Sequence, residues 1–230
     1  MKTIGLIGGM SWESTQSYYQ LLNQGIKMKL GGLHSAKIVL VSLDFASIAA
    51  LQQQQDWPQM AEILIKAAKQ VEAAGADYLL ICTNTMHKLA EQVQAAVAIP
   101  LLHIADAVGE NLIQHNFKKV ALLGTQFTME QDFYKQRLAD KFAIDVLIPD
   151  VQGRETVHRI IYDELCKGII KPESKAEYLT IIDNLTQQGA EAVILGCTEI
   201  GLLVQQSDTS IPLLDSTAVH CAMALENSLK

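Results

Sequence analysis

Charge is scarce in this sequence, and positive charge is the scarcer kind. Only 19% of the 230 residues are charged, and 18 Lys and Arg stand against 25 Asp and Glu, which leaves a net charge of −7. Nucleic acids and anionic membranes are bound through clustered Lys and Arg, so neither is expected as a partner. Because 49% of the residues are apolar, the chain is predicted to fold around a substantial core rather than to be disordered.

Long apolar runs and cysteine motifs are also missing. No run of about 18 apolar residues occurs, so no transmembrane helix is predicted. The apolar N-terminal stretch is broken by glycines and has no small-residue cleavage site, so we interpret it as a buried strand and not as a secretory signal. The four cysteines form no CxxC pair and no zinc-ligand spacing (Cys82, Cys166, Cys197 and Cys221). We therefore expect a cytoplasmic protein with free thiols and without a metal site.

What the sequence does contain is a regular alternation of short apolar runs and longer segments with helical spacing. The apolar runs are predicted to be buried parallel strands (residues 4–7, 38–41, 78–82, 120–123, 193–195 and 211–214). The segments between them include four predicted helices (residues 60–74, 91–97, 129–142 and 176–188). This alternation predicts an α/β fold with mostly parallel sheets.

An internal repeat divides the chain into two similar halves. Three landmarks recur in the same order, with offsets of 116, 114 and 112 residues (5–8 with 121–124, 75–83 with 189–197, and 99–102 with 211–214). Such a repeat predicts two α/β lobes related by a pseudo-two-fold axis. We expect lobe 1 to comprise residues 1–98 and 210–230, and lobe 2 to comprise residues 99–209.

The repeat also predicts where a ligand binds. Ligands of open parallel sheets lie beyond the carboxyl ends of the strands, so two related lobes would direct these ends at one cleft between them. Residues 8–11 would then face residues 124–127, and residues 83–85 would face residues 197–199.

Cys197 is the residue best suited to chemistry. It follows Gly196 at the end of a predicted strand and precedes Thr198 and Glu199. If a helix begins there, its free N–H groups and its dipole would stabilise a thiolate and bind a carboxylate ligand. The alternative is a cysteine that only packs in the core, which is common for a free thiol.

The repeat pairs Cys197 with Thr83. Asn84 and Thr85 follow, and their short polar side chains can bind an anion or can simply cap a helix. His87 would lie in the first turn of that helix, where a structural role is more common than a catalytic one.

Together these motifs resemble those of the aspartate/glutamate racemase superfamily, whose members need no cofactor and have two related α/β lobes. Residues 5–11 resemble the first loop of the family, residues 83–87 its first catalytic motif (normally Cys-Asn-Thr-x-His), and residues 196–199 its second. The resemblance extends from residue 2 to about residue 214. It implies two-base racemisation of an amino acid, in which one cysteine removes the α-proton and the other returns a proton to the opposite face.

This sequence departs from the family pattern at Thr83, where the family has its first cysteine. Forming a thiolate at pH 7 costs about 2 kcal/mol for an ordinary cysteine, whereas ionising an aliphatic hydroxyl costs about 12 kcal/mol. Thr83 is therefore expected to be a weak proton donor, with Cys197 the one efficient base. In the family the second cysteine attacks the L-enantiomer, so the resemblance implies L-aspartate or L-glutamate as the preferred substrate. Cys82 is an alternative thiol, but it would point to the opposite side of its strand.

Further substrate contacts follow from the same resemblance. Asn84, Thr85, Thr198 and Glu199 belong to the matched motifs, and Thr83 is expected to contact the substrate as well as to act on it. Met10 is expected to line the cleft, with core packing as its alternative, and Gln52 to add a polar contact. Lys167 is predicted to contact the distal carboxylate, with Cys166 as the alternative register and a solvated surface lysine as the alternative role. No arginine precedes Arg137, although some aspartate racemases use one here, so the preference among acidic and neutral amino acids stays open.

Three other classes of function compete with this interpretation. A nucleotide-binding enzyme is disfavoured because the chain has neither a GxGxxG nor a GxxxxGK[ST] motif. A related isomerase or decarboxylase of maleate, hydantoins or malonates is a second possibility, and a non-catalytic protein that binds a small carboxylate is a third. Members of the family are commonly homodimers, so we expect a homodimer here.

Overall fold

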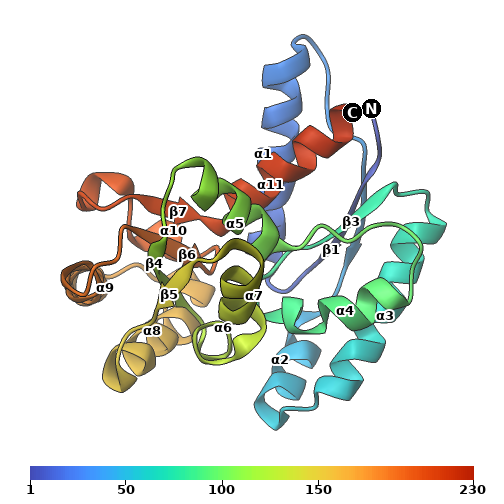
Figure 1. Cartoon of the computed structure of the whole chain (residues 1–230). Helices are drawn as coiled ribbons and strands as arrows, with labels where there is room; N and C mark the ends of the chain where they lie inside the picture. Colours follow the sequence, from blue (N-terminus) through green and yellow to red (C-terminus); the bar gives the residue numbers. More distant parts are fainter. The chain divides into compact units, whose positions relative to one another are not determined.

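The chain folds into two α/β units, and the computed structural model describes all 230 residues (Figure 1). Unit 1 comprises Met1–Ile104 and His220–Lys230, and unit 2 comprises Ala105–Val219. Each unit has its own parallel sheet, which confirms the predicted fold class.

The sheet of unit 1 contains three strands in the order β2-β1-β3 (β1, Ile4–Gly8; β2, Ile38–Ser42; β3, Tyr78–Ile81). All pairings are parallel, and Ile4 lies in register with Ile38 on one side and Tyr78 on the other. A single parallel bridge joins Leu79 to Leu101 beyond β3. The side chains of β1 alternate between two cores, since Leu6 packs toward Tyr18 and Ile7 packs toward Met60.

The helices of unit 1 cover both faces of this sheet (α1, Trp12–Leu30; α2, Phe45–Gln54; α3, Trp57–Ala73; η1, Thr85–Leu89; α4, Ala90–Ala95). The start of α3 shows why these residues form a helix. Asp56 caps it by accepting a hydrogen bond from the Gln59 N–H at 3.1 Å, and Pro58 occupies the first turn. Met60 and Leu64 then begin its buried stripe.

The sheet of unit 2 contains four parallel strands in the order β5-β4-β6-β7 (β4, Lys119–Gly124; β5, Asp145–Leu147; β6, Ala192–Gly196; β7, Leu213–Asp215). We did not predict β5, because it has only three residues and begins with a charged one. Strand β7 begins at Leu213 and not at the predicted residue 211. Pro212 has no N–H to donate to a sheet, although its carbonyl accepts from the Val193 N–H at 2.8 Å.

Eight helical segments belong wholly or mainly to unit 2 (α5, Ile104–Gln114; α6, Gln126–Glu130; α7, Asp132–Phe142; α8, Val151–Asp163; η2, Leu165–Lys167; α9, Pro172–Gln187; α10, Ile200–Leu203; η3, Gln206–Asp208). The prediction of one helix over residues 129–142 was wrong. Gln131 is extended there and separates α6 from α7. The sequence hides this break because Phe133 follows Met129 by four residues and Leu138 follows Tyr134 by four, although the buried residues Met129 and Tyr134 are five apart. The hydrophobic pattern alone therefore does not reveal the break.

The two sheets share one strand order, as the sequence repeat predicts. Leu79 of β3 bridges to Leu101, and Val193 of β6 pairs with Leu213 of β7. The repeat matches Leu79 with Val193 and Leu101 with Leu213. Strand β7 therefore corresponds to the single bridge at Leu101 and is longer.

The unit boundaries lie later in the chain than the expected ones, after residues 104 and 219 instead of residues 98 and 209. The bridge at Leu101 keeps that segment with unit 1, and the pairing of β7 with β6 keeps β7 with unit 2. The last helix, α11 (Ser216–Leu229), begins in unit 2 and continues in unit 1. There the Tyr78 hydroxyl donates to the Ala224 carbonyl at 2.6 Å. The end of the chain therefore packs with its beginning, as Figure 1 shows near the two termini.

None of the helices combines the length and apolar character that crossing a membrane requires.

Candidate functional site

Cys197 lies directly after β6, and its side chain is half-buried in unit 2. The thiol donates a hydrogen bond to Glu199 Oε2 at 2.9 Å, and the Thr198 hydroxyl donates to the same oxygen at 2.9 Å. Glu199 is buried, with 6% of its surface exposed. In these three consecutive residues, one carboxylate oxygen thus accepts hydrogen bonds from both a thiol and a hydroxyl.

The surroundings of Cys197 favour the protonated thiol. Burial, the negative charge of Glu199 and the neighbouring Cys166 thiol raise the pKa of Cys197 well above its ordinary value. The stabilisation of a thiolate that a helix beginning at Cys197 would provide is not found, and the pKa of the thiol is raised instead. The physical reason is local, because α10 has only four residues and begins three residues beyond Cys197, whereas Glu199 is in direct contact.

Two further side chains approach Cys197 in unit 2. Burial raises the pKa of Tyr162 on α8, and the nearby thiols of Cys197 and Cys166 add to this effect. Cys166, on η2, is half-buried and packs against the same apolar core as Cys197. Tyr162 has no role in the motifs recognised in the sequence. Its spacing of four residues from Cys166 is the one sequence signal that places the two side chains on the same side of a helix.

The structure places Cys166, rather than Lys167, beside Cys197. Lys167 is exposed, and its Nζ lies 3.7 Å from the Asp163 carboxylate one helical turn earlier. An exposed ion pair of this kind fits the alternative role of Lys167, that of a solvated surface lysine. A contact between Lys167 and a substrate carboxylate stays a prediction.

Two glycines bring the loops after β4 and β6 together. Gly124 and Gly196 are paired residues at the carboxyl ends of these strands. A Cβ atom on Gly124 would lie 3.0 Å from the Gly196 carbonyl oxygen. Thr125 follows and caps α6 by accepting from the Thr128 N–H at 3.3 Å. Because neither glycine has a side chain, the backbone that leads into Cys197 can lie next to the backbone that leads into Thr125.

Thr83 lies in unit 1, two residues beyond the end of β3, and is half-buried. Its backbone is held firmly, because the Thr83 carbonyl lies 2.8 Å from His87 Nδ1. The preceding carbonyl, that of Cys82, accepts from the Ser14 hydroxyl at 2.8 Å. The predicted proton donor therefore lies in a rigid turn.

The residues after Thr83 are buried, and Asn84 does not act as a helix cap. Asn84 precedes η1 but makes no side-chain capping bond to it, and Thr85 is the first residue of η1. Gln52 of α2 lies against this segment, with its Nε2 3.4 Å from the Met86 sulfur. The structure thus brings Gln52 to the Thr83 motif, although residues 52 and 83 are far apart in sequence.

The first loop of unit 1 depends on its glycines. Gly9 has a φ of 85°, and a Cβ atom there would overlap the backbone of Leu43. The Gly9 N–H donates to the Thr15 hydroxyl at 2.8 Å, and Ser11 caps α1. Met10 is buried in the core of unit 1, which is the alternative role named for it.

Cys82 does not supply the thiol that Thr83 lacks. Its side chain is fully buried in an apolar core with Leu6, Tyr18 and Leu22, and this burial raises its pKa. Cys82 still follows the pairing of β3, since its N–H donates to the Ile7 carbonyl at 2.9 Å, whereas Thr83 lies beyond this pairing and is partly exposed.

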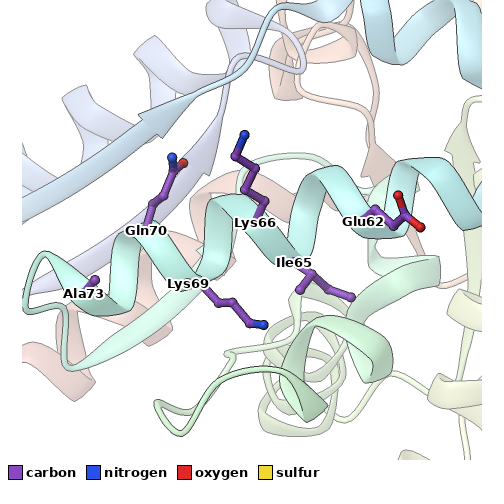
Figure 2. A pocket seen from close by; sticks show the side chains of 6 residues that line it. All are labelled: Glu62, Ile65, Lys66, Lys69, Gln70 and Ala73. Atoms are coloured by element: carbon purple, nitrogen blue, oxygen red, sulfur yellow. The ribbon is translucent and has the colours of Figure 1, made fainter.

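No group of three or more His, Cys, Asp and Glu residues within either unit is placed to hold a metal ion. A surface depression of about 520 Å³ lies along α3, as Figure 2 shows. The six residues that line it recur every three or four positions on this one helix (Glu62, Ile65, Lys66, Lys69, Gln70 and Ala73). Their side chains spread along one face of the helix, as Figure 2 shows, and do not converge on a common point. It is the outer face of a helix and contains none of the candidate site residues.

The fold and these motifs define the class of protein. The model of the Asp/Glu/Hydantoin racemase family matches residues 7–224, and the chain belongs to this family of isomerases.

Particular proteins resemble the chain, and two of them are solved structures that match it over its whole length. A candidate Asp/Glu racemase from Yersinia pestis is 51% identical, with a TM-score of 0.94 and full coverage of both chains. An aspartate racemase homologue from Pyrococcus horikoshii OT3 is 35% identical, with a TM-score of 0.87 and the same coverage. The broad specificity amino-acid racemase RacX of Bacillus subtilis (strain 168) is 26% identical over 171 residues, which are 71% of this chain and 70% of that protein.

Proposed function

We propose that this protein is a cofactor-independent amino-acid racemase that acts on L-aspartate or L-glutamate. In this proposal Cys197 removes the α-proton, and Thr83 returns a proton to the opposite face of the α-carbon. Family membership supports the class of reaction. The observation that carries the assignment of the base is the 2.9 Å hydrogen bond from the Cys197 thiol to Glu199.

Cys197 must lose its own proton before it can act as a base, and Glu199 is the acceptor in contact with it. Transfer from Sγ to Glu199 Oε2 leaves a thiolate and a neutral carboxylic acid. The raised pKa of Cys197 opposes this transfer in the ligand-free protein. The α-ammonium group of a bound amino acid would supply the missing positive charge and favour the thiolate. The base would thus form mainly when the substrate is present.

The thiolate then takes the α-proton, and the electron pair of the broken C–H bond stays on the α-carbon as a carbanion. Thr83 donates a proton from the opposite side and regains one from water, and the proton held by Glu199 neutralises the hydroxide that this leaves, which returns Glu199 to its carboxylate form. A hydroxyl is a far weaker acid than a thiol, so this return step is expected to be slower than removal of the proton by Cys197. Exchange of the α-proton would therefore be faster from the L-enantiomer than from the D-enantiomer, whereas kcat/KM for inversion is the same in both directions because the two enantiomers are equally stable.

Recognition of the substrate would involve polar groups from both motifs. Thr83, Asn84, Thr85 and Gln52 of unit 1, together with Thr198 and Glu199 of unit 2, offer hydroxyl, amide and carboxylate groups for the α-substituents. Met10 adds an apolar contact, and Lys167 is the proposed partner of the distal carboxylate. The relatives are named for aspartate, for Asp/Glu and for broad specificity, so the range of side chains is itself part of the proposal. A homodimer in the cytoplasm also belongs to the proposal.

The test is proton NMR of the purified protein in D₂O with L-Asp, D-Asp, L-Glu and D-Glu in separate samples, without added cofactor. Loss of the α-proton signal and the chirality of the product are followed together. The proposal expects exchange and inversion from the L-enantiomers, and neither in Cys197→Ser. Exchange by the Cys197→Ser variant at the wild-type rate would overturn the assignment of the base.

Thr83 favours a second candidate function, since the first catalytic cysteine of the family is absent. A protein that binds a small carboxylate without racemising it would keep its ligand affinity in Cys197→Ser and would exchange no α-proton. A related isomerase or decarboxylase would act on another carboxylate and lose that activity in the same variant.

A further inference from the structure

Three histidines of unit 1 form a buried cluster behind Thr83. The ring of His87 lies 4.6 Å from that of His103 and 5.6 Å from that of His220, measured between centroids. All three are almost completely buried. They come from three separate segments, which are η1, the stretch before α5, and α11. Only His87 belongs to a motif that the sequence reveals, and 133 residues separate it from His220.

The partners of His87 and His220 determine which ring nitrogen carries the proton. His87 Nδ1 lies 2.8 Å from the Thr83 carbonyl, which can only accept, so Nδ1 must donate. The Ile104 N–H donates to His87 Nε2 at 3.2 Å, so Nε2 must be unprotonated. His220 has the opposite tautomer, since its Nε2 donates to the Leu102 carbonyl at 2.9 Å and its Nδ1 accepts from the Tyr18 hydroxyl at 2.8 Å.

Both rings are therefore neutral and use both of their nitrogens. Burial, reinforced by His103 and His220, lowers the pKa of His87 well below its ordinary value. Burial lowers the pKa of His220 to about 4. A charged His87 ring would place a second N–H against the Ile104 N–H, which has no acceptor to offer.

The cluster also lies at both points where the chain changes units. Unit 1 ends its first segment at Ile104 and resumes at His220. His87 binds Ile104 through one ring nitrogen and the Thr83 carbonyl through the other. One side chain thus links the proposed proton donor to the residue at which the chain leaves unit 1.

We propose that His87 is a positioning residue for Thr83, which it holds in place as a neutral ring with the proton on Nδ1. This inference rests on the proposed function, because it concerns the proton that Thr83 returns. His87 does not touch the reacting atoms, so it acts on the return step and not on removal of the α-proton by Cys197. Loss of the His87 bond should therefore impair inversion more than exchange.

The first experiment is independent of activity. Nitrogen-15 NMR of the ring nitrogens distinguishes the two neutral tautomers from the charged ring. The expected result for wild-type protein at pH 7 is a neutral His87 with the proton on Nδ1 and a neutral His220 with the proton on Nε2. A charged His87, or one with its proton on Nε2, would overturn the inference whatever the enzyme does.

The second experiment compares exchange with inversion for the L-enantiomer in D₂O. His87→Leu keeps the bulk of the ring and removes both hydrogen bonds, whereas His87→Asn keeps an N–H donor close to the position of Nδ1. His115→Leu is the matched control, because the exposed His115, just beyond the end of α5, makes the same kind of bond from Nδ1 to the Asn111 carbonyl, four residues earlier, at 2.9 Å.

We expect His87→Leu to lower kcat for inversion at least tenfold, with KM and the exchange rate within about threefold of wild type. His87→Asn should recover part of the inversion, and His115→Leu should behave as wild type. An unchanged ratio of inversion to exchange in His87→Leu, with wild type active, would overturn the positioning role alone. Wild-type protein that exchanges no α-proton overturns the proposed function and the catalytic role of His87 with it. If His87→Leu does not fold, His87→Asn and the tautomers of the wild type still decide the matter.

Discussion

The thiol of Cys197 donates to the buried carboxylate of Glu199 at 2.9 Å, so the candidate base is held in its protonated form by the residue that can also take its proton. The same charge that raises the pKa of the thiol makes Glu199 an effective acceptor. In the proposed mechanism, a positive group beside Cys197 would lower the cost of moving this proton to Glu199.

Replacing Glu199 by Gln should separate these two effects. The variant loses the acceptor, so exchange of the L-substrate is expected to fall about 100-fold or more. It also loses the negative charge, so the pKa of Cys197 should fall. Alkylation of Cys197 by iodoacetamide, followed by mass spectrometry across a pH series, should show its midpoint at lower pH than in wild type. A variant with full activity would show that another group takes the proton.

Replacing Thr83 should alter the balance between the enantiomers. Thr83→Cys restores the thiol of the family motif, and we expect it to raise turnover of the D-enantiomer at least tenfold, since a thiol ionises at far lower cost than a hydroxyl. Thr83→Ala should keep exchange from the L side and lose inversion. Chiral chromatography of the products measures both. Equal rates of α-proton exchange from the two enantiomers, measured by proton NMR of wild-type protein in D₂O, would contradict a one-sided site.

The buried His220 should make the stability of the protein depend on pH. Its pKa is about 4 in the folded protein and about 6.5 in an unfolded chain. Between these values the unfolded chain binds the proton more tightly than the folded protein does. The contribution of neutral His220 to the free energy of unfolding is therefore fully present above pH 6.5 and is lost as the pH falls. The loss between pH 7 and pH 5 should be about 2 kcal/mol.

Urea unfolding of wild type and His220→Gln at these two pH values checks this expectation. Other groups titrate in the same range, so the difference between the two proteins is the quantity to compare. The variant should lose less stability on acidification than the wild type. Identical losses would show that His220 does not titrate differently on folding.

Gly9 should tolerate a side chain far less well than Gly31. Both have positive φ, of 85° and 73°, which costs about 1–2 kcal/mol for alanine. A Cβ atom at Gly31 meets nothing within 4 Å, whereas one at Gly9 overlaps the backbone of Leu43. Gly9→Ala is therefore expected to lower the free energy of unfolding by about 2 kcal/mol more than Gly31→Ala. Equal losses in urea unfolding would mean that the first loop shifts to make room.

The sequence by itself determined the elements whose signals are local. Short apolar runs predicted six of the seven strands, and the repeat predicted that the two sheets would share one order. Thr83 and Cys197 could be located at strand ends because a strand and its following motif are contiguous in the chain. The weak signals failed, as with the three-residue β5 and the break at Gln131, which the sequence hides because Phe133 follows Met129 at helical spacing.

The tertiary structure alone decided what surrounds each chemical group. Cys166 rather than Lys167 lies beside Cys197, and the pKa of the thiol is raised where the sequence predicted a stabilised thiolate. The histidine cluster joins residues 87, 103 and 220, which no local pattern connects. The physical reason is common to all three cases. Burial and electrostatic neighbours are set by the packing of distant segments, whereas the position of a residue in a strand or turn is set by the residues next to it.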